Sequence, residues 1–150
     1  MPELTSIVLD TNVALDLLHF HDPSVASLYA ALTAGRLTCL GDARTLGEFA
    51  RVLTYAQLAI PKARADKILP AYRTLIRDVP GSGSPIRLPS CRDPDDQPFL
   101  ELAARGNARW LVSKDKKVLE LSRSRYHALP FAILHPRDLP DFLLPDPRIQ

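Results

Sequence analysis

The chain has 150 residues, of which 46% are hydrophobic and 24% charged, with a formal net charge of +2. This length and composition fit one domain with a core of its own, and so small a charge permits nucleic-acid binding without requiring it. The sequence has no apolar stretch long enough for a membrane span and no signal-peptide pattern, which predicts a cytoplasmic protein. Its two cysteines, Cys39 and Cys91, match neither a zinc nor a redox spacing, so we expect reduced thiols.

The first predicted element is a buried strand, Ile7–Leu9, which ends abruptly in Asp10, Thr11 and Asn12. In open α/β sheets, ligands bind at the edge where such strands end. A carboxylate there is costly to remove from water unless something pairs with it. The candidates for pairing with Asp10 are a metal ion, a basic side chain and backbone N–H groups.

Helical and strand patterns then alternate to the end of the chain. The later predicted strands are Leu37–Leu40, a short edge strand Ile86–Leu88, Trp110–Ser113 and Phe131–Leu134. The predicted helices span 13–21, 23–35, 42–53, 61–79 with a kink or break at Pro70, 93–106, 118–121 and 136–144. This alternation predicts a parallel sheet covered on both faces, a three-layer α/β/α fold. We expect a single domain over residues 1–144 and a loose tail over 145–150.

Four acidic residues fall where this scaffold brings chain segments to one edge of the sheet. Asp10 and Asp115 each follow a predicted strand. Glu48 borders the apolar face of its helix, and Asp96 lies in the first turn of another. Carboxylates gathered in one pocket raise one another's pKa unless cations neutralise them, and such oxygen-rich sites select Mg²⁺ or Mn²⁺. The predicted chemistry is metal-assisted phosphodiester hydrolysis with one or two ions.

Each acid also has a simpler explanation. Asp10 is able to cap the following helix, and Glu48 to pair with Arg44 or Arg51, which lie one helical turn away. At least one acid of the 93–96 segment serves as a helix cap, and Asp115 also suits a turn. Within 93–96, the offset from Phe99 favours Asp96 as the metal ligand, with Asp93 second.

The basic residues are unevenly distributed. Residues 36–77 hold eight Lys or Arg and three acids, and residues 104–127 hold seven and two, whereas residues 1–35 have four acids and no Lys or Arg. Basic segments beside an acidic site suit a polyanionic substrate, although they also suit solvated helix faces. The candidates for contacting phosphate are Arg44, Lys114, Lys116 and Lys117.

Four segments, in order, give the chain a family resemblance: Val8–Val13, Thr45–Phe49, Asp93–Leu100 and Leu111–Lys116. Together they resemble the PIN-domain nucleases, in particular the VapC-like toxins of prokaryotic toxin–antitoxin pairs. The resemblance extends over about residues 5–144. The sequence departs from the family pattern at Lys117, where a second Asp is common, and at Ser113, where Thr is frequent.

The resemblance implies a five-stranded parallel sheet of order 3-2-1-4-5. It also implies an RNA substrate, cleavage that leaves a 5′-phosphate, dimerisation and a cognate antitoxin. Transferred to this sequence, its metal-site acids are Asp10, Glu48, Asp96 and Asp115, supported by Asn12 and Ser113. Two other functions stay open: a DNA nuclease or phosphatase with the same acidic site, and a non-catalytic RNA-binding or protein-interaction module.

Overall fold

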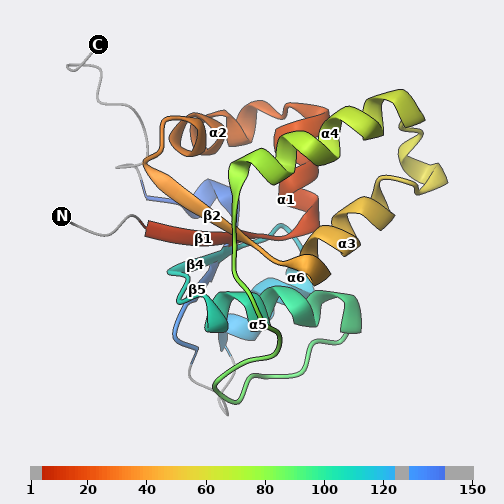
Figure 1. Ribbon diagram of the computed structural model, residues 1–150. Coiled ribbons are helices and arrows are strands. Elements are labelled where there is room, and N and C mark those ends of the chain that lie inside the picture. Colours follow the sequence, from red (N-terminus) through yellow and green to blue (C-terminus); the bar gives the residue numbers. More distant parts are fainter. Residues whose placement is uncertain (1–4, 124–128, 141–150) are drawn as a thin grey trace, which may run out of the picture.

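The structure is a computed structural model, and it describes residues 5–123 and 129–140. Within these residues five parallel strands form one sheet in the order β3-β2-β1-β4-β5 (Figure 1). The strands are β1 Thr5–Leu9, β2 Leu37–Gly41, β3 Ile76–Asp78, β4 Trp110–Val112 and β5 Ala132–Leu134. The predicted α/β class and strand order are therefore confirmed.

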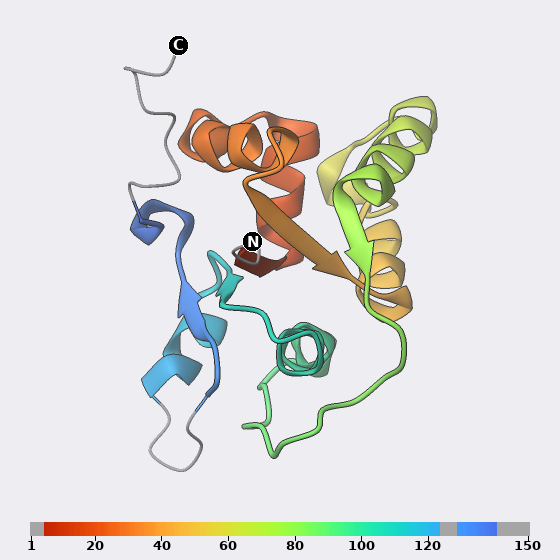
Figure 2. The same cartoon turned by 60° about the vertical axis from the view of Figure 1, so that its left-hand side comes forward.

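Helices cover the sheet on both faces, which makes three layers (Figure 2). The α-helices are α1 Thr11–Leu15, α2 Ala26–Thr33, α3 Ala43–Val52, α4 Lys62–Leu75, α5 Gln97–Arg105 and α6 Lys116–Leu119. Helix α1 continues as a π-helical turn, Asp16–Phe20. The 3₁₀ turns are Pro23–Val25, Ala56–Leu58, Pro94–Asp96, Glu120–Arg123 and Pro136–Asp138.

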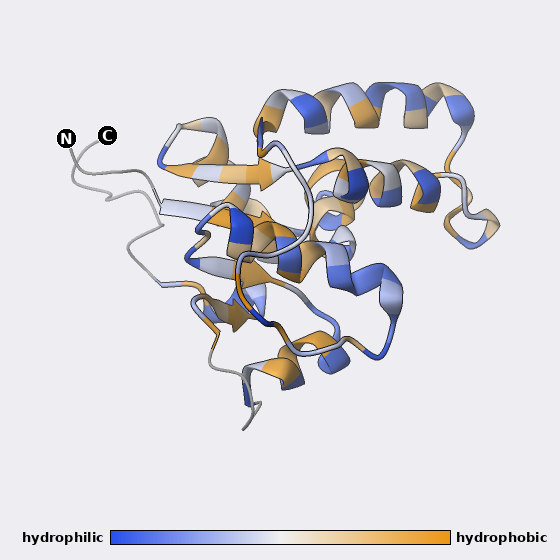
Figure 3. Ribbon diagram, turned by 60° about the horizontal axis from the view of Figure 1, so that its bottom comes forward, coloured by the Kyte–Doolittle hydropathy of each residue, from blue (hydrophilic) through white to orange (hydrophobic). Residues whose placement is uncertain are grey.

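Alternate side chains of β1 belong to two different cores. Ile7 and Leu9 pack with the apolar faces of α1 to α4 on one side of the sheet. Val8 packs with α5 and α6 on the other side. The two-residue repeat of a strand explains why a continuous apolar run is needed here, since both faces of the sheet are buried. Figure 3 shows the corresponding hydrophobic colour along the strands.

Two predictions in the middle of the chain are wrong. The helix predicted over 61–79 ends at Leu75. Pro70 lies inside α4, so it does not break the helix in two, and the kink stays a prediction. The edge strand is β3, not Ile86–Leu88, which lies in a loop. β3 pairs with β2, and at Gly41 a side chain would collide with Ile76, so glycine allows the close approach. Pairing with the sheet therefore overrides the helical periodicity at this point.

The C-terminal prediction is also corrected. In place of a helix over 136–144, the described chain has only the 3₁₀ turn Pro136–Asp138, after which Leu139 is extended. Residues 141–144 and the predicted loose tail, 145–150, lie outside the described residues.

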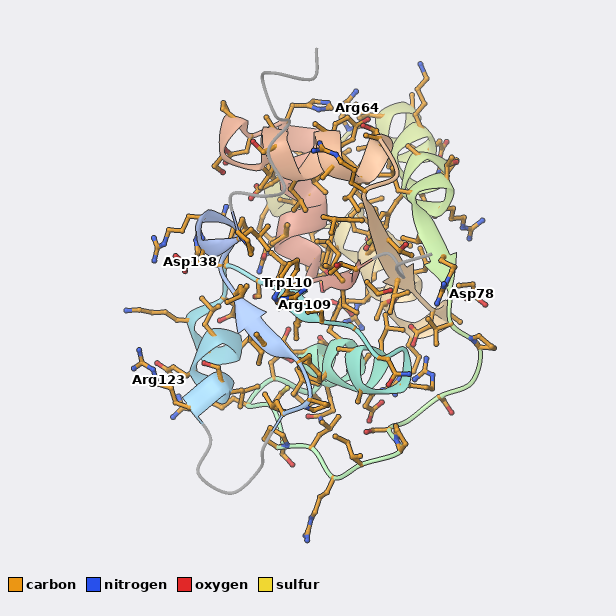
Figure 4. The ribbon with its side chains drawn as sticks, turned by 90° about the vertical axis from the view of Figure 1, so that its left-hand side faces the viewer. Arg64, Asp78, Arg109, Trp110, Arg123 and Asp138 are labelled. Carbon is orange, nitrogen blue, oxygen red and sulfur yellow. The ribbon has the colours of Figure 1, made fainter. Side chains whose placement is uncertain are left out.

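At the amino end of β4, the Arg109 guanidinium lies 5.0 Å from the centre of the Trp110 ring (Figure 4), and this contact shields a core residue. No helix of the described residues is long and apolar enough to cross a membrane.

Candidate functional site

A cavity of about 280 Å³ lies at the edge of the sheet where β1 and β4 end. Six carboxylates line it: Asp10, Glu48, Asp93, Asp95, Asp96 and Asp115. The four acids predicted from the sequence are among them, and they come from separate parts of the chain. Parallel strands place the ends of β1 and β4 side by side, which brings Asp10 and Asp115 together. Glu48 from α3 and Asp96 from the 3₁₀ turn before α5 line the same cavity.

Asp10 is both a helix cap and a lining residue of the cavity. Its carboxylate is the N-cap of α1, accepting a hydrogen bond of 2.8 Å from the Thr11 backbone N–H. Only 5% of the residue is exposed. Burial raises the pKa of Asp10, and the nearby Asp115 adds to the rise, whereas hydrogen bonds from Ser113, Thr11 and Asn12 oppose it. The capping role and the site role are therefore compatible.

Ser113 and Asn12 hold the Asp10 carboxylate in place. The Ser113 hydroxyl donates to Oδ2 of Asp10 at 2.6 Å, and the Asn12 amide donates to the same oxygen at 3.2 Å. Ser113 Oγ in turn accepts from the Asp115 backbone N–H at 3.0 Å, and Asn12 Oδ1 accepts from the Lys114 N–H at 3.2 Å. The two residues expected to support the site therefore connect its two strand-end acids.

Asp115 is the N-cap of α6 and accepts a hydrogen bond of 2.9 Å from the Lys117 N–H. Lys116 and Lys117 are exposed at the start of that helix. Lys114 is engaged elsewhere: its Nζ donates at 2.6 Å to the buried Asp16, which does not line the cavity. Of the three lysines predicted to contact phosphate, Lys114 is therefore held in an ion pair, whereas Lys116 and Lys117 face solvent.

Glu48 projects from α3 and its side chain is 16% exposed. Burial raises the pKa of Glu48, while its ion pair with Arg51 lowers it and the carboxylates of Asp95, Asp93 and Asp10 raise it further. Of the two arginines one turn away, Arg51 therefore makes the pair. Arg44 instead contacts Glu101 of α5 at 2.7 Å.

The 93–96 segment contributes three acids in different roles. Asp93 caps the 3₁₀ turn, accepting from the Asp95 N–H at 2.9 Å. Asp95 binds Arg51 at 2.8 Å. Asp96 is half-buried, and burial together with the charges of Asp10, Asp93 and other carboxylates raises its pKa to about 7. Asp96 is the acid whose charge the surroundings oppose most plainly.

Sequence reasoning did not identify Asp95 or Tyr55 as parts of the site. Asp95 lines the cavity, and in the sequence it lies between Asp93 and Asp96. The motif alone did not decide which of these three acids belongs to the site. Tyr55, in the segment after α3, also lines the cavity. No sequence motif marks Tyr55. It lines the cavity because of the path that the chain takes after α3.

The donor set fits a hard divalent cation. All six charged groups that line the cavity are carboxylates, the ligands that Mg²⁺ and Mn²⁺ prefer. Thr11 also lines the cavity, and its buried hydroxyl has no hydrogen-bond partner among the described residues. Among the described residues, however, no three acidic, His or Cys side chains lie close enough to form a ready-made metal site. One of the carboxylates, Glu48, is paired with Arg51 instead.

Comparison with known proteins agrees with this geometry. The model of the PIN-domain family matches residues 6–117. The chain belongs to the PIN-domain family. The matched residues run from β1 into α6 and so include all four acids. PIN domains are in general nucleases that use divalent metal ions, and this chain has their fold and a carboxylate-lined cavity where its parallel strands end. No match was found among the curated proteins.

Proposed function

We propose that this PIN domain is a Mg²⁺- or Mn²⁺-dependent endoribonuclease and the toxin of a toxin–antitoxin pair. The observation that carries the proposal is the gathering of Asp10, Glu48, Asp96 and Asp115 around one cavity of about 280 Å³. These four side chains would hold one or two ions. A bound divalent ion would supply positive charge to the phosphodiester and lower the pKa of a water.

The rest of the site positions those acids. Ser113 and Asn12 fix the Asp10 carboxylate, and the cap at Asp115 fixes the start of α6. The exposed Lys116 and Lys117 suit contact with a phosphate chain, whereas Lys114 serves the fold through Asp16. RNA as substrate, 5′-phosphate products, a homodimer, a cytoplasmic location and a partner antitoxin rest on the resemblance to VapC-like toxins.

The test is cleavage of single-stranded RNA, single-stranded DNA, flap DNA and a small phosphoester, each with Mg²⁺ or with EDTA. Wild-type protein should cut RNA only with metal. Asp10→Asn and Asp96→Asn should each lower the rate by more than about a hundredfold, which exceeds the cost of losing an outer-shell partner. The exposed Asp66 of α4 provides the matched control, Asp66→Asn, which should retain activity.

Several results would contradict the proposal. Metal-dependent cleavage that both site variants retain would place the active site elsewhere. Preferred cleavage of DNA or of the phosphoester would show that the protein is a hydrolase other than a ribonuclease. Absence of Mn²⁺ binding in calorimetry would favour a non-catalytic module. For the toxin role, the gene should lie beside one that encodes a small DNA-binding protein able to relieve growth arrest caused by this chain.

A further inference from the structure

One arginine beside the cavity binds two of its carboxylates. A single nitrogen of the Arg51 guanidinium, Nη2, contacts Oε2 of Glu48 and, at 2.8 Å, Oδ2 of Asp95. Glu48 lies on α3 and Asp95 in the 3₁₀ turn before α5, so Arg51 joins two walls of the site. Its own side chain is 51% exposed and extends along the surface.

Arg51 is a cation in direct contact with two carboxylates of an otherwise acidic cavity. No Lys or Arg of the described residues belongs to the cavity lining, which has six carboxylates. Arg51 lines the adjacent hollow, which shares Glu48 and Asp95 with the cavity. Glu48 and Asp95 lie close to other carboxylates, which oppose their negative charge. The Arg51 guanidinium therefore stabilises them in the way that a metal cation would.

We infer that Arg51 is an internal counter-cation, which neutralises Glu48 and Asp95 in the metal-free protein and competes with the metal for Glu48. This inference rests on the proposed metal-dependent function. A divalent ion that binds Oε2 of Glu48 needs the oxygen that Arg51 holds, so entry of the ion there displaces the guanidinium. Arg51 thus stabilises the metal-free fold and weakens the affinity for metal.

The exposure of Arg51 suits an exchangeable partner. An ion pair with a half-exposed arginine is weak because solvent screens it, so it is easily broken when a stronger cation arrives. The pair between Arg105 and Asp42 is different, because their side chains are only 14% and 6% exposed. That buried pair belongs to the permanent structure, whereas the pair at Arg51 is open to solvent and to the cavity.

Arg44 provides a matched control on the same helix. Its side chain is 53% exposed, close to that of Arg51, and it too pairs with a glutamate. That glutamate is Glu101, which does not line the cavity. Replacing either arginine by glutamine removes one positive charge from α3 and one ion-paired side chain, but only one of the two replacements frees a carboxylate of the site.

The experiment is calorimetric titration of Mn²⁺ into the full-length wild type, Arg51→Gln and Arg44→Gln. Loss of the competing pair should make Arg51→Gln bind Mn²⁺ about fivefold more tightly, while Arg44→Gln should bind as the wild type does. If the wild type binds Mn²⁺ and Arg51→Gln binds it equally or more weakly, the inference is wrong and the proposed function stands. If the wild type binds no Mn²⁺, both fail.

Thermal unfolding gives a second readout that needs no titration. In EDTA, Arg51→Gln should unfold at a lower temperature than the wild type, because Glu48 and Asp95 lose their counter-ion. With saturating Mn²⁺ the difference should shrink, because the ion takes over that role. Arg51→Lys, which keeps the charge, should lie between the two proteins in EDTA. An equal loss of stability with and without Mn²⁺ would make Arg51 an ordinary structural residue and overturn the inference.

Discussion

The Ser113 hydroxyl donates a hydrogen bond of 2.6 Å to the carboxylate of Asp10, although the two residues lie 103 positions apart. Leu9 and Val112 are paired in the register of β1 and β4, so the residues that follow them emerge side by side. Ser113 has no exposed surface, and Asp10 is almost as deeply buried. The bond therefore gives the desolvated Asp10 carboxylate one of its few donors. It also joins the end of β1 to the end of β4 within the site.

Removing this donor should destabilise the fold. Ser113→Ala leaves the buried Asp10 carboxylate short of a charge-assisted hydrogen bond, so the free energy of unfolding should fall by about 1–3 kcal/mol. Urea denaturation at pH 7 in EDTA measures the change. Ser122→Ala is the control, since that exposed hydroxyl bonds only to the Leu119 carbonyl oxygen. An equally small effect of both substitutions would contradict the role given to Ser113.

A second prediction concerns the ion pair between Lys114 and Asp16. Lys114→Met leaves Asp16 charged and buried without its partner, because the Nζ–Oδ2 contact of 2.6 Å is lost. We expect a loss of about 2 kcal/mol, less than the roughly 3–5 kcal/mol of a fully buried pair, since Lys114 is partly exposed. In a double-mutant cycle with Asp16→Asn, the double variant should lose less than the two single losses added together. Strict additivity would show that the pair contributes nothing.

The sequence was sufficient to predict the architecture wherever periodicity and burial agree. The apolar runs before Asp10 and Asp115 correspond to β1 and β4, which are buried on both faces. β3 could not be found in this way, because its three residues are half-buried or exposed and have no two-residue pattern. Its position depends on pairing with Gly41, a tertiary contact that periodicity does not encode.

In the candidate site, too, one part could be predicted from the sequence and another part could not. Its four acids could be predicted because parallel strands and their crossovers meet at one edge of the sheet. The partner of Glu48 could not, since Arg44 and Arg51 both lie one turn away along α3. The choice is made by what faces each arginine: Glu101 of α5 in one case and Asp95 in the other. That choice requires the packed structure.

A third prediction tests how the loop after β3 is held. Arg105 donates to the carbonyl oxygens of Pro80 and Gly83 and forms the buried pair with Asp42. Arg105→Ala should cost about 3 kcal/mol, because it leaves the buried Asp42 charge without its partner. It should also speed tryptic cleavage after the exposed Arg87 in that loop. Arg73→Ala, an exposed change on α4, serves as the control in a timed digestion followed by mass spectrometry. Unchanged cleavage after Arg87 would show that Arg105 does not hold the loop.

The last prediction concerns pH and the metal-free protein. Burial, together with the neighbouring carboxylates, raises the pKa of Asp96 from 3.8 to about 7, so the folded protein keeps this proton to higher pH than the unfolded chain does. The contribution of Asp96 to stability is therefore full below about pH 4 and is lost as the pH rises towards 7. In EDTA, Asp96→Asn should raise the unfolding temperature by a few degrees at pH 8 and by clearly less at pH 5.

Thermal unfolding at the two pH values, with Asp66→Asn as an exposed control, measures the effect. A stabilisation of the same size at pH 5 and pH 8 would mean that charge repulsion is not its source, and a loss at pH 8 would mean that the Asp96 carboxylate makes net favourable contacts. Saturating Mn²⁺ should reverse the order at pH 8, since the wild type gains the ion's binding energy and the variant lacks a ligand. The charge that destabilises the protein in EDTA is, on this view, the same charge that attracts the metal.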